Sequence, residues 1–213
     1  MKTKKALIIS LCFNILFVSL VLSLSYIYRD KLYQRFVLYK GDAKIVMFGN
    51  SITAQGIWVE LLGRTDVANS GLPGQSTYYF LKMIQSQVID LHPKICFVKG
   101  GINDITVGVA PEKLQANYRL ILETLVHNNI IPVVTLTFHE RNNPTSKVEV
   151  DNLNKFLVNY CREHHIKYLN LNQYLSDSTG LKAEFAADQT HLNRNGYIIW
   201  AKEIEKILKE EGI

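Results

Sequence analysis

The sequence predicts an α/β fold: a five-stranded parallel sheet in a three-layer α/β/α sandwich, preceded by one N-terminal transmembrane helix. After Lys40, short apolar runs of strand length alternate with longer segments whose apolar residues recur at helical spacing. Strands and helices that take turns along a chain favour a parallel sheet covered on both faces. A length of 213 residues, 47% of them apolar and 20% charged, supports one domain with a sizeable core and excludes a disordered chain.

The first element is an uncharged run from Ala6 to Tyr28, interrupted only by Asn14 and four serines. It is long enough to cross a bilayer as a helix, and three lysines precede it. We therefore expect residues 1–36 to form a membrane anchor or signal segment with a linker, and residues 37–213 to form the catalytic domain. The tendency of a short N-terminus to stay in the cytoplasm predicts that this domain is exported, to a periplasmic or extracytoplasmic location.

A cleaved signal peptide is the alternative for this segment, and it would make the protein secreted. Its apolar region would be shorter, about 7 to 15 residues, and would end in a small-x-small site. Ser23-Leu24-Ser25 fits such a site. An uncleaved anchor is the interpretation that we favour, because the apolar run is longer than a signal peptide needs.

The net charge of +5 does not indicate a nucleic-acid partner. Residues 1–36 hold six of the 24 basic residues and one of the 19 acidic residues, which leaves 18 of each in the rest of the chain. The expected domain is therefore neutral and offers no basic surface for a polyanion.

Cysteine and histidine spacing predicts neither a metal site nor a disulfide framework. Cys12 lies in the apolar N-terminal run, while Cys96 and Cys161 fall in a strand and a helix, where buried free thiols are expected. The His164-His165 pair has no further ligand nearby and is expected at an exposed helix end. We expect no metal and no cofactor.

The expected strands are short and apolar, and the expected helices are amphipathic. The strands span residues 44–48, 67–69, 95–98, 131–138 and 167–171. The helices span residues 57–62, 77–90, 111–128, 147–165 and 196–211. Trp58 and Trp200 fall on apolar helical stripes and are expected in the core.

Open parallel sheets bind ligands outside the carboxyl ends of their strands, so the loops after the strands are where chemistry is expected. Polar clusters follow the strands in turn: Gly49-Asn50-Ser51, then residues 69–74, then Gly100 to Asp104. Asp188-Gln189-Thr190-His191 stands directly before the last helix. All of them are predicted on the same rim.

These clusters contain the groups that acyl transfer needs. A serine becomes nucleophilic when a base takes its proton, the base needs a group that fixes its tautomer, and the oxyanion needs preorganised donors. Asp188 and His191 stand three residues apart, close enough for the carboxylate to reach the imidazole. Gly74 can bring its backbone N–H close to a substrate, and Asn103 offers an uncharged amide donor.

The four blocks together resemble the SGNH, or GDSL-like, hydrolase superfamily. The blocks are "FGNSIT", "NSGLPGQST", "GGIND" and "DQTHLNRNGY", in family order from Lys44 to about Lys209. The resemblance implies a flavodoxin-like topology and ester hydrolysis without a metal. It also implies site roles: Ser51 as nucleophile, His191 as base and then acid, Asp188 as its orienter, and an oxyanion hole formed by Ser51, Gly74 and Asn103.

One residue departs from the family pattern, because the first block usually reads Gly-Asp-Ser and here has Asn50. We expect a changed hydrogen-bond network around the serine, with nucleophilicity kept. Relatives that resemble carbohydrate O-acetylesterases share Gly-Asn-Ser, which favours a glycan O-acetyl ester as substrate. Asn50 and His139, the latter at the end of the fourth strand, are candidates for the substrate cleft.

Several alternatives stay open at this point. A lipase, lysophospholipase or thioesterase fits the same residues, as does an acyltransferase that passes the acyl group to a sugar hydroxyl, whereas a non-catalytic binding module would be expected to lack a triad member. Taken singly, Ser51 could cap a helix and Gly74 could be a turn residue. Asn103 and Asp104 could cap the helix that follows, and for Asp104 this is the role that we expect.

Overall fold

The computed structural model describes residues 2–29 and 43–213, in two compact units that comprise residues 1–40 and 41–213. In the first unit, α1 (Lys2–Ile27) is a continuous helix. Its segment Lys4–Ile27 has a mean hydropathy of 2.6 and is long and apolar enough to cross a membrane, a property that an anchor and a signal sequence share. The predicted boundary between residues 36 and 37 lies outside the described residues.

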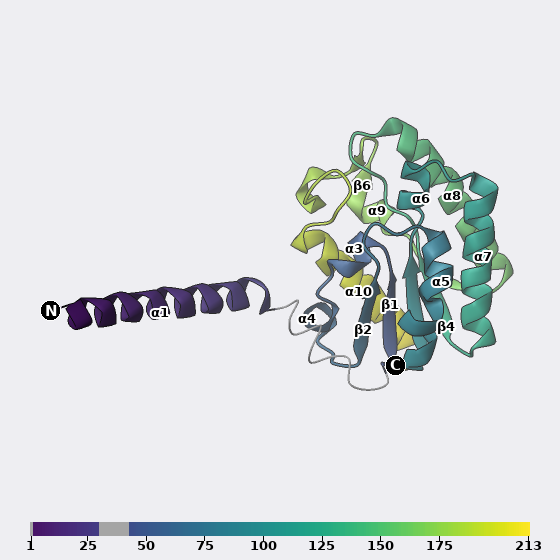
Figure 1. Cartoon of the computed structure of the whole chain (residues 1–213). Coiled ribbons are helices and arrows are strands. Elements are labelled where there is room, and N and C mark those ends of the chain that lie inside the picture. Colours follow the sequence, from purple (N-terminus) through teal and green to yellow (C-terminus); the bar gives the residue numbers. More distant parts are fainter. Residues whose placement is uncertain (1, 30–42) are drawn as a thin grey trace. The chain divides into compact units, whose positions relative to one another are not determined.

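The second unit is built on a five-stranded parallel sheet with the strand order β2-β1-β3-β4-β5 (Figure 1). The strands are β1 (Ile45–Gly49), β2 (Val67–Gly71), β3 (Ile95–Lys99), β4 (Ile131–Thr135) and β5 (Lys167–Leu169). This is the flavodoxin-like order. The strand order runs from β1 to β2 on one side and from β3 to β5 on the other, so it reverses between the neighbours β1 and β3.

Helices pack on both faces of the sheet. Alternate strand residues point to opposite faces and so belong to two separate hydrophobic cores. The helices of one core are α5 (Thr77–Gln87), α7 (Pro111–His127) and α8 (Pro144–Glu163), which pack on residues such as Val46 and Val98. Those of the other are chiefly α4 (Trp58–Leu62) and α10 (Arg194–Glu210), which pack on residues such as Met47 and Phe97. The predicted three-layer fold is therefore confirmed. Trp58 and Trp200 are fully buried and meet edge to face, with ring centroids 4.8 Å apart.

The boundaries of two elements differ from the prediction for a visible reason. β4 ends at Thr135, three residues before the predicted Phe138, because the Thr137 N–H donates to the Asn154 side chain on α8 and not to a strand. α8 begins at Pro144, before the predicted Lys147, because the Asn143 side chain caps its first turn by accepting from the Ser146 N–H.

Some short elements were not predicted, because two to five residues carry too little periodicity. They are α3 (Ser51–Ala54), α6 (Ile102–Thr106), α9 (Asn172–Leu175), the hairpin of β6 (Ser176–Asp177) and β7 (Gly180–Leu181), and single 3₁₀ turns at Ile89–Leu91 and Ala183–Phe185. Two of them, α3 and α6, hold candidate site residues.

Candidate active site

Ser51 is the first residue of α3, and only Asn50 separates it from the carboxyl end of β1. Asn50 is the N-cap of this short helix, and its side-chain oxygen accepts from the Ile52 N–H at 3.1 Å. The strand approaches its neighbour so closely here that a Cβ on Gly49 would lie 2.4 Å from the Lys99 carbonyl oxygen and 2.2 Å from Thr53 Oγ1. Only glycine fits, and the serine is consequently presented at the rim of the sheet.

His191 connects Ser51 to Asp188. Its Nε2 lies 2.9 Å from Ser51 Oγ, and its Nδ1 lies 2.8 Å from Asp188 Oδ2. Asp188 is further held by the turn it belongs to, because its Oδ1 accepts from the backbone N–H groups of Thr190 and His191 at 2.8 and 2.7 Å. The structure thus brings together three residues that come from two loops about 140 positions apart.

The charge state of Asp188 determines which imidazole nitrogen carries the proton. The backbone N–H groups of His191 and Thr190 lower the pKa of the Asp188 carboxyl to about 2, so it is ionised at neutral pH. An ionised carboxylate only accepts hydrogen bonds, so in the neutral imidazole Nδ1 is protonated and Nε2 presents its lone pair to the Ser51 hydroxyl. This arrangement can remove the serine proton.

The turn that carries His191 is fixed against the serine by α10. Asn193 caps this helix by accepting from the N–H groups of Asn195 and Gly196. One turn later the buried Tyr197 hydroxyl donates to the Ile52 carbonyl at 2.6 Å, which joins α10 to α3.

The two remaining candidate donors lie in adjoining segments. Asn103, on α6, donates its side-chain amide to the Gln75 carbonyl at 2.9 Å, so it contacts the loop that contains Gly74. Gly74 has a φ of +74° and an exposed backbone, a conformation that side chains rarely adopt. The start of this loop is held against β1, where the Leu72 N–H donates to the Gly49 carbonyl at 2.6 Å.

The two residues suggested for the substrate cleft have other surroundings. Asn50 is completely buried, so its side chain lines no open cleft. His139 is 8% exposed, and its Nε2 contacts Asp151 Oδ1 at 2.7 Å. It lines a pocket of about 310 Å³ at the carboxyl ends of β4 and β5, with none of Ser51, Asp188 and His191 among the lining residues.

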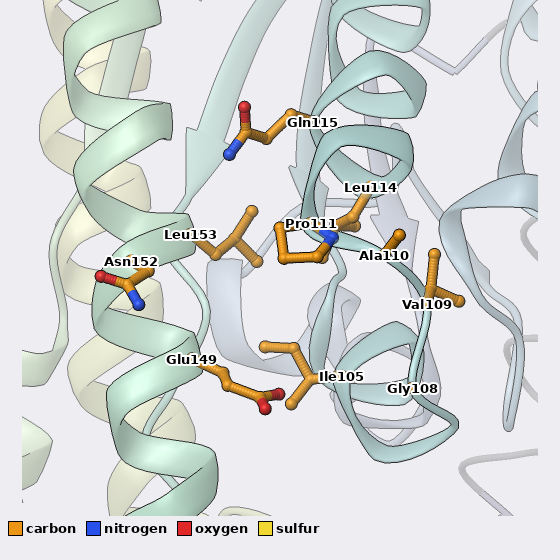
Figure 2. Close-up of a pocket in the computed structure, with 10 residues that line it drawn as sticks. All are labelled: Ile105, Gly108, Val109, Ala110, Pro111, Leu114, Gln115, Glu149, Asn152 and Leu153. Carbon is orange, nitrogen blue, oxygen red and sulfur yellow. The ribbon is translucent and has the colours of Figure 1, made fainter.

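A second pocket, of about 240 Å³, lies between α6, α7 and α8 (Figure 2). Ile105, Pro111 and Leu153 face it from the three elements, with Glu149 at its edge. Although Ile105 is two residues from Asn103, no candidate site residue lines this pocket.

Two residues of the site region were not anticipated. Lys99, at the end of β3, is 1% exposed although it is charged, and its only sequence signal was a lysine that closes an otherwise apolar strand. Thr77 binds the carboxylate of Asp104, 27 residues away, and a contact at that separation leaves no local signal. The prediction that Asp104 caps the helix that follows it is therefore wrong. Asp104 lies within α6 and accepts from the Thr77 N–H at the start of α5. Within the described ranges, no group of three His, Cys, Asp or Glu side chains could hold a metal ion.

Comparison with known proteins identifies relatives for most of the domain. Residues 47–199 match the sequence model of the GDSL-like lipase/acylhydrolase family. A GDSL-like lipase from Bacteroides thetaiotaomicron superposes with a TM-score of 0.74 at 20% identity, over 85% of this chain and 98% of the other. A catalytic mutant of an acetylxylan esterase from Geobacillus stearothermophilus gives 0.65 at 16% identity, over 78% and 94%.

A sequence relative that is named for a different activity aligns with part of the chain. It is an N-acylneuraminate cytidylyltransferase of Streptococcus agalactiae, 23% identical over 99 residues, or 46% of this chain. The aligned segment spans only about a quarter of that enzyme, 24% of its length.

Proposed function

The chain belongs to the GDSL-like lipase/acylhydrolase family and is a hydrolase that acts on ester bonds, and we propose that it is a serine esterase that removes short acyl groups, chiefly acetyl, from a glycan. The observation that carries the proposal is the hydrogen-bonded series from Ser51 Oγ through His191 to Asp188. Such a series supplies a nucleophile, a base and the group that orients the base.

In the proposed mechanism, Ser51 attacks the ester carbonyl while His191 Nε2 takes its proton. The tetrahedral oxyanion is stabilised by the N–H groups of Ser51 and Gly74 and by the Asn103 amide. His191 then returns the proton to the departing alcohol, which leaves an acyl-enzyme. Water that His191 activates releases the acid and restores the serine.

The glycan part of the proposal is supported by the names of similar proteins. One structural neighbour is an acetylxylan esterase, and the partial sequence relative is an N-acylneuraminate cytidylyltransferase, so both names refer to sugars. Asn50 stands where the family usually has aspartate, and that departure favours the same substrate class. We further propose that α1 keeps the protein in a membrane, with the domain exported, and that a cleaved signal sequence is the alternative.

The test is ester hydrolysis by the full-length chain in detergent, with wild type beside Ser51→Ala. The substrates are p-nitrophenyl acetate, p-nitrophenyl palmitate, acetylated xylo-oligosaccharide and O-acetylated N-acetylneuraminate. We expect acetate release that Ser51→Ala abolishes, while Ser86→Ala, an exposed serine on α5, retains it. Full activity in Ser51→Ala would disprove the assignment of Ser51 as the nucleophile. A preference for the palmitate ester would indicate a lipid substrate and not a glycan.

The same residues would serve an acyltransferase, in which a sugar hydroxyl replaces water in the second step. Adding an unacetylated sugar to the assay separates the two reactions, because only a transferase yields an acetylated acceptor.

A further inference from the structure

Asp104 is a buried carboxylate that lies next to Asn103 on α6 and binds a different helix. It is completely inaccessible to solvent, and its oxygens accept from the Thr77 N–H at 3.0 and 3.1 Å. Its Oδ1 also accepts from the Thr77 hydroxyl at 2.6 Å. Two donors of one residue, the first of α5, therefore meet both oxygens of this carboxylate.

This contact takes the place of the side-chain capping hydrogen bond that α5 lacks. Ser76 occupies the N-cap position, but its side chain makes no capping hydrogen bond. The first backbone N–H groups of a helix need acceptors, and a carboxylate is favoured there by the helix dipole. Asn117 of α7 completes the cluster by donating its side-chain amide to the Thr77 hydroxyl at 2.9 Å.

The contact also determines the position of residues 72–76, which we call the Gly74 loop. Its first residue, Leu72, is bonded to Gly49, directly before the serine loop. Gln75 accepts from Asn103, and Thr77, just after the loop, is bonded to Asp104. Both proposed oxyanion donors outside the serine loop, the Gly74 N–H and the Asn103 amide, are thus connected to the same turn of α6.

We propose that Asp104 is a positioning residue for the oxyanion hole: by binding Thr77 it holds the Gly74 loop at a fixed distance from Asn103, so that both donors meet one oxygen. The inference rests on the proposed serine-esterase function. Burial raises the pKa of the Asp104 carboxyl, while its hydrogen bonds from Thr77 act in the opposite direction, as expected for a carboxylate kept in the interior by local donors.

The main variant is Asp104→Asn, in full-length protein acting on p-nitrophenyl acetate. An asparagine keeps the shape but turns an NH₂ group toward the Thr77 N–H, so the loop has to move. Because a misplacement of about 1 Å can cost about 100-fold in rate, we expect kcat to fall by about 10- to 100-fold with little change in KM. Asp90→Asn, at the other end of the same crossover, is the matched control and should retain kcat.

A second readout separates positioning from a general loss of structure. In the thiono analogue of the substrate, sulfur replaces the carbonyl oxygen and accepts hydrogen bonds weakly. An intact oxyanion hole therefore favours the oxygen ester, and a partly unfolded enzyme loses activity on both esters equally. We expect the oxygen-to-sulfur rate ratio to fall in Asp104→Asn, as in Asn103→Ala, and to stay unchanged in Asp90→Asn.

Thr77 provides a second pair of variants if Asp104→Asn does not fold. Thr77→Val removes the hydroxyl that donates to Asp104 and should lower kcat and the rate ratio, while Thr77→Ser keeps the hydroxyl and both values. Wild-type kcat and an unchanged ratio in Asp104→Asn, or equal activity of the two Thr77 variants, would overturn the inference. If Ser51→Ala loses activity while the Asp104 or Thr77 variants give such a result, the proposed esterase function is supported and only the inference about Asp104 fails.

Discussion

Replacing Lys99 by methionine should stabilise the protein, and by an amount that depends on pH. Lys99 is 1% exposed, and no hydrogen-bond acceptor for its Nζ occurs in the part of the chain that the structure describes. Its Nζ makes a cation–π contact with the ring of Phe138, whose centroid lies 4.5 Å away. Burial lowers the pKa of Lys99 from 10.5 to about 7. Methionine fills a similar volume and has no charge to desolvate.

The size of the effect follows from the lowered pKa. The fall from 10.5 to about 7 corresponds to about 4–5 kcal/mol of unfavourable free energy at or below pH 7, at about 1.4 kcal/mol per pH unit. From pH 7 to 10.5 the unfolded chain binds the proton that the folded chain has lost, so wild-type stability rises with pH. The loss of the contact with Phe138, worth about 1–2 kcal/mol, reduces the net gain of Lys99→Met at pH 7 to about 2–4 kcal/mol.

The assay is urea unfolding followed by tryptophan fluorescence, because both tryptophans of the chain, Trp58 and Trp200, are buried in the domain. We expect the stabilisation by Lys99→Met to shrink by about 1.5 kcal/mol between pH 7 and pH 8.5. Lys94→Met, an exposed position just before β3, is the control and should change stability by less than about 0.5 kcal/mol at either pH. A stability difference that is the same at both pH values would show that Lys99 does not lose its proton on folding.

Four further predictions concern the site and its support. Asn103→Ala should lower kcat by about 10²–10³-fold with the melting temperature nearly unchanged, since one oxyanion donor is lost; an unchanged kcat would remove Asn103 from the site. Asp188→Asn should lower kcat by about 10³–10⁴-fold, because an amide favours the other imidazole tautomer. Because the pKa of Asp188 is lowered from 3.8 to about 2, the unfolded chain binds a proton below about pH 4 that the folded chain does not bind, so the stability this carboxyl contributes should be full above about pH 4 and be lost progressively between about pH 4 and pH 2 in an acid titration of unfolding. Gly49→Ala should destabilise the domain by about 1–3 kcal/mol in urea unfolding, because its Cβ would lie 2.4 Å from a backbone oxygen; adding Thr53→Ala should recover only part of this.

How well the sequence predicted each element depended on how local its cause is. The strands β1 and β3 are buried on both faces, so they read as continuous apolar runs and were placed to within a residue. The end of β4 was misplaced because Asn154, 17 residues away, takes the Thr137 N–H. Short helices such as α6 were missed because five residues carry too little periodicity.

The candidate site follows the same division. Asp188 and His191 are three residues apart, so their hydrogen bond was predictable from spacing. The rule that loops after parallel strands share one rim predicted that His191 and Ser51 lie on the same edge, and the family resemblance implied their contact. In contrast, the contact of Asp104 with Thr77 joins two helices across 27 residues, and the complete burial of Asn50 has no local signal, so neither was predictable from the sequence.

Asn50 shows how a departure from the family pattern can suit this particular site. The position needs an acceptor for the Ile52 N–H, and asparagine supplies it at 3.1 Å just as aspartate would. The position is also fully buried and adjoins Ser51, where the proposed reaction builds up a negative charge. A carboxylate at this buried position would oppose that charge and would itself be costly to desolvate. The amide therefore keeps the helix cap and avoids the electrostatic cost, which explains why a Gly-Asn-Ser block is compatible with the proposed nucleophile.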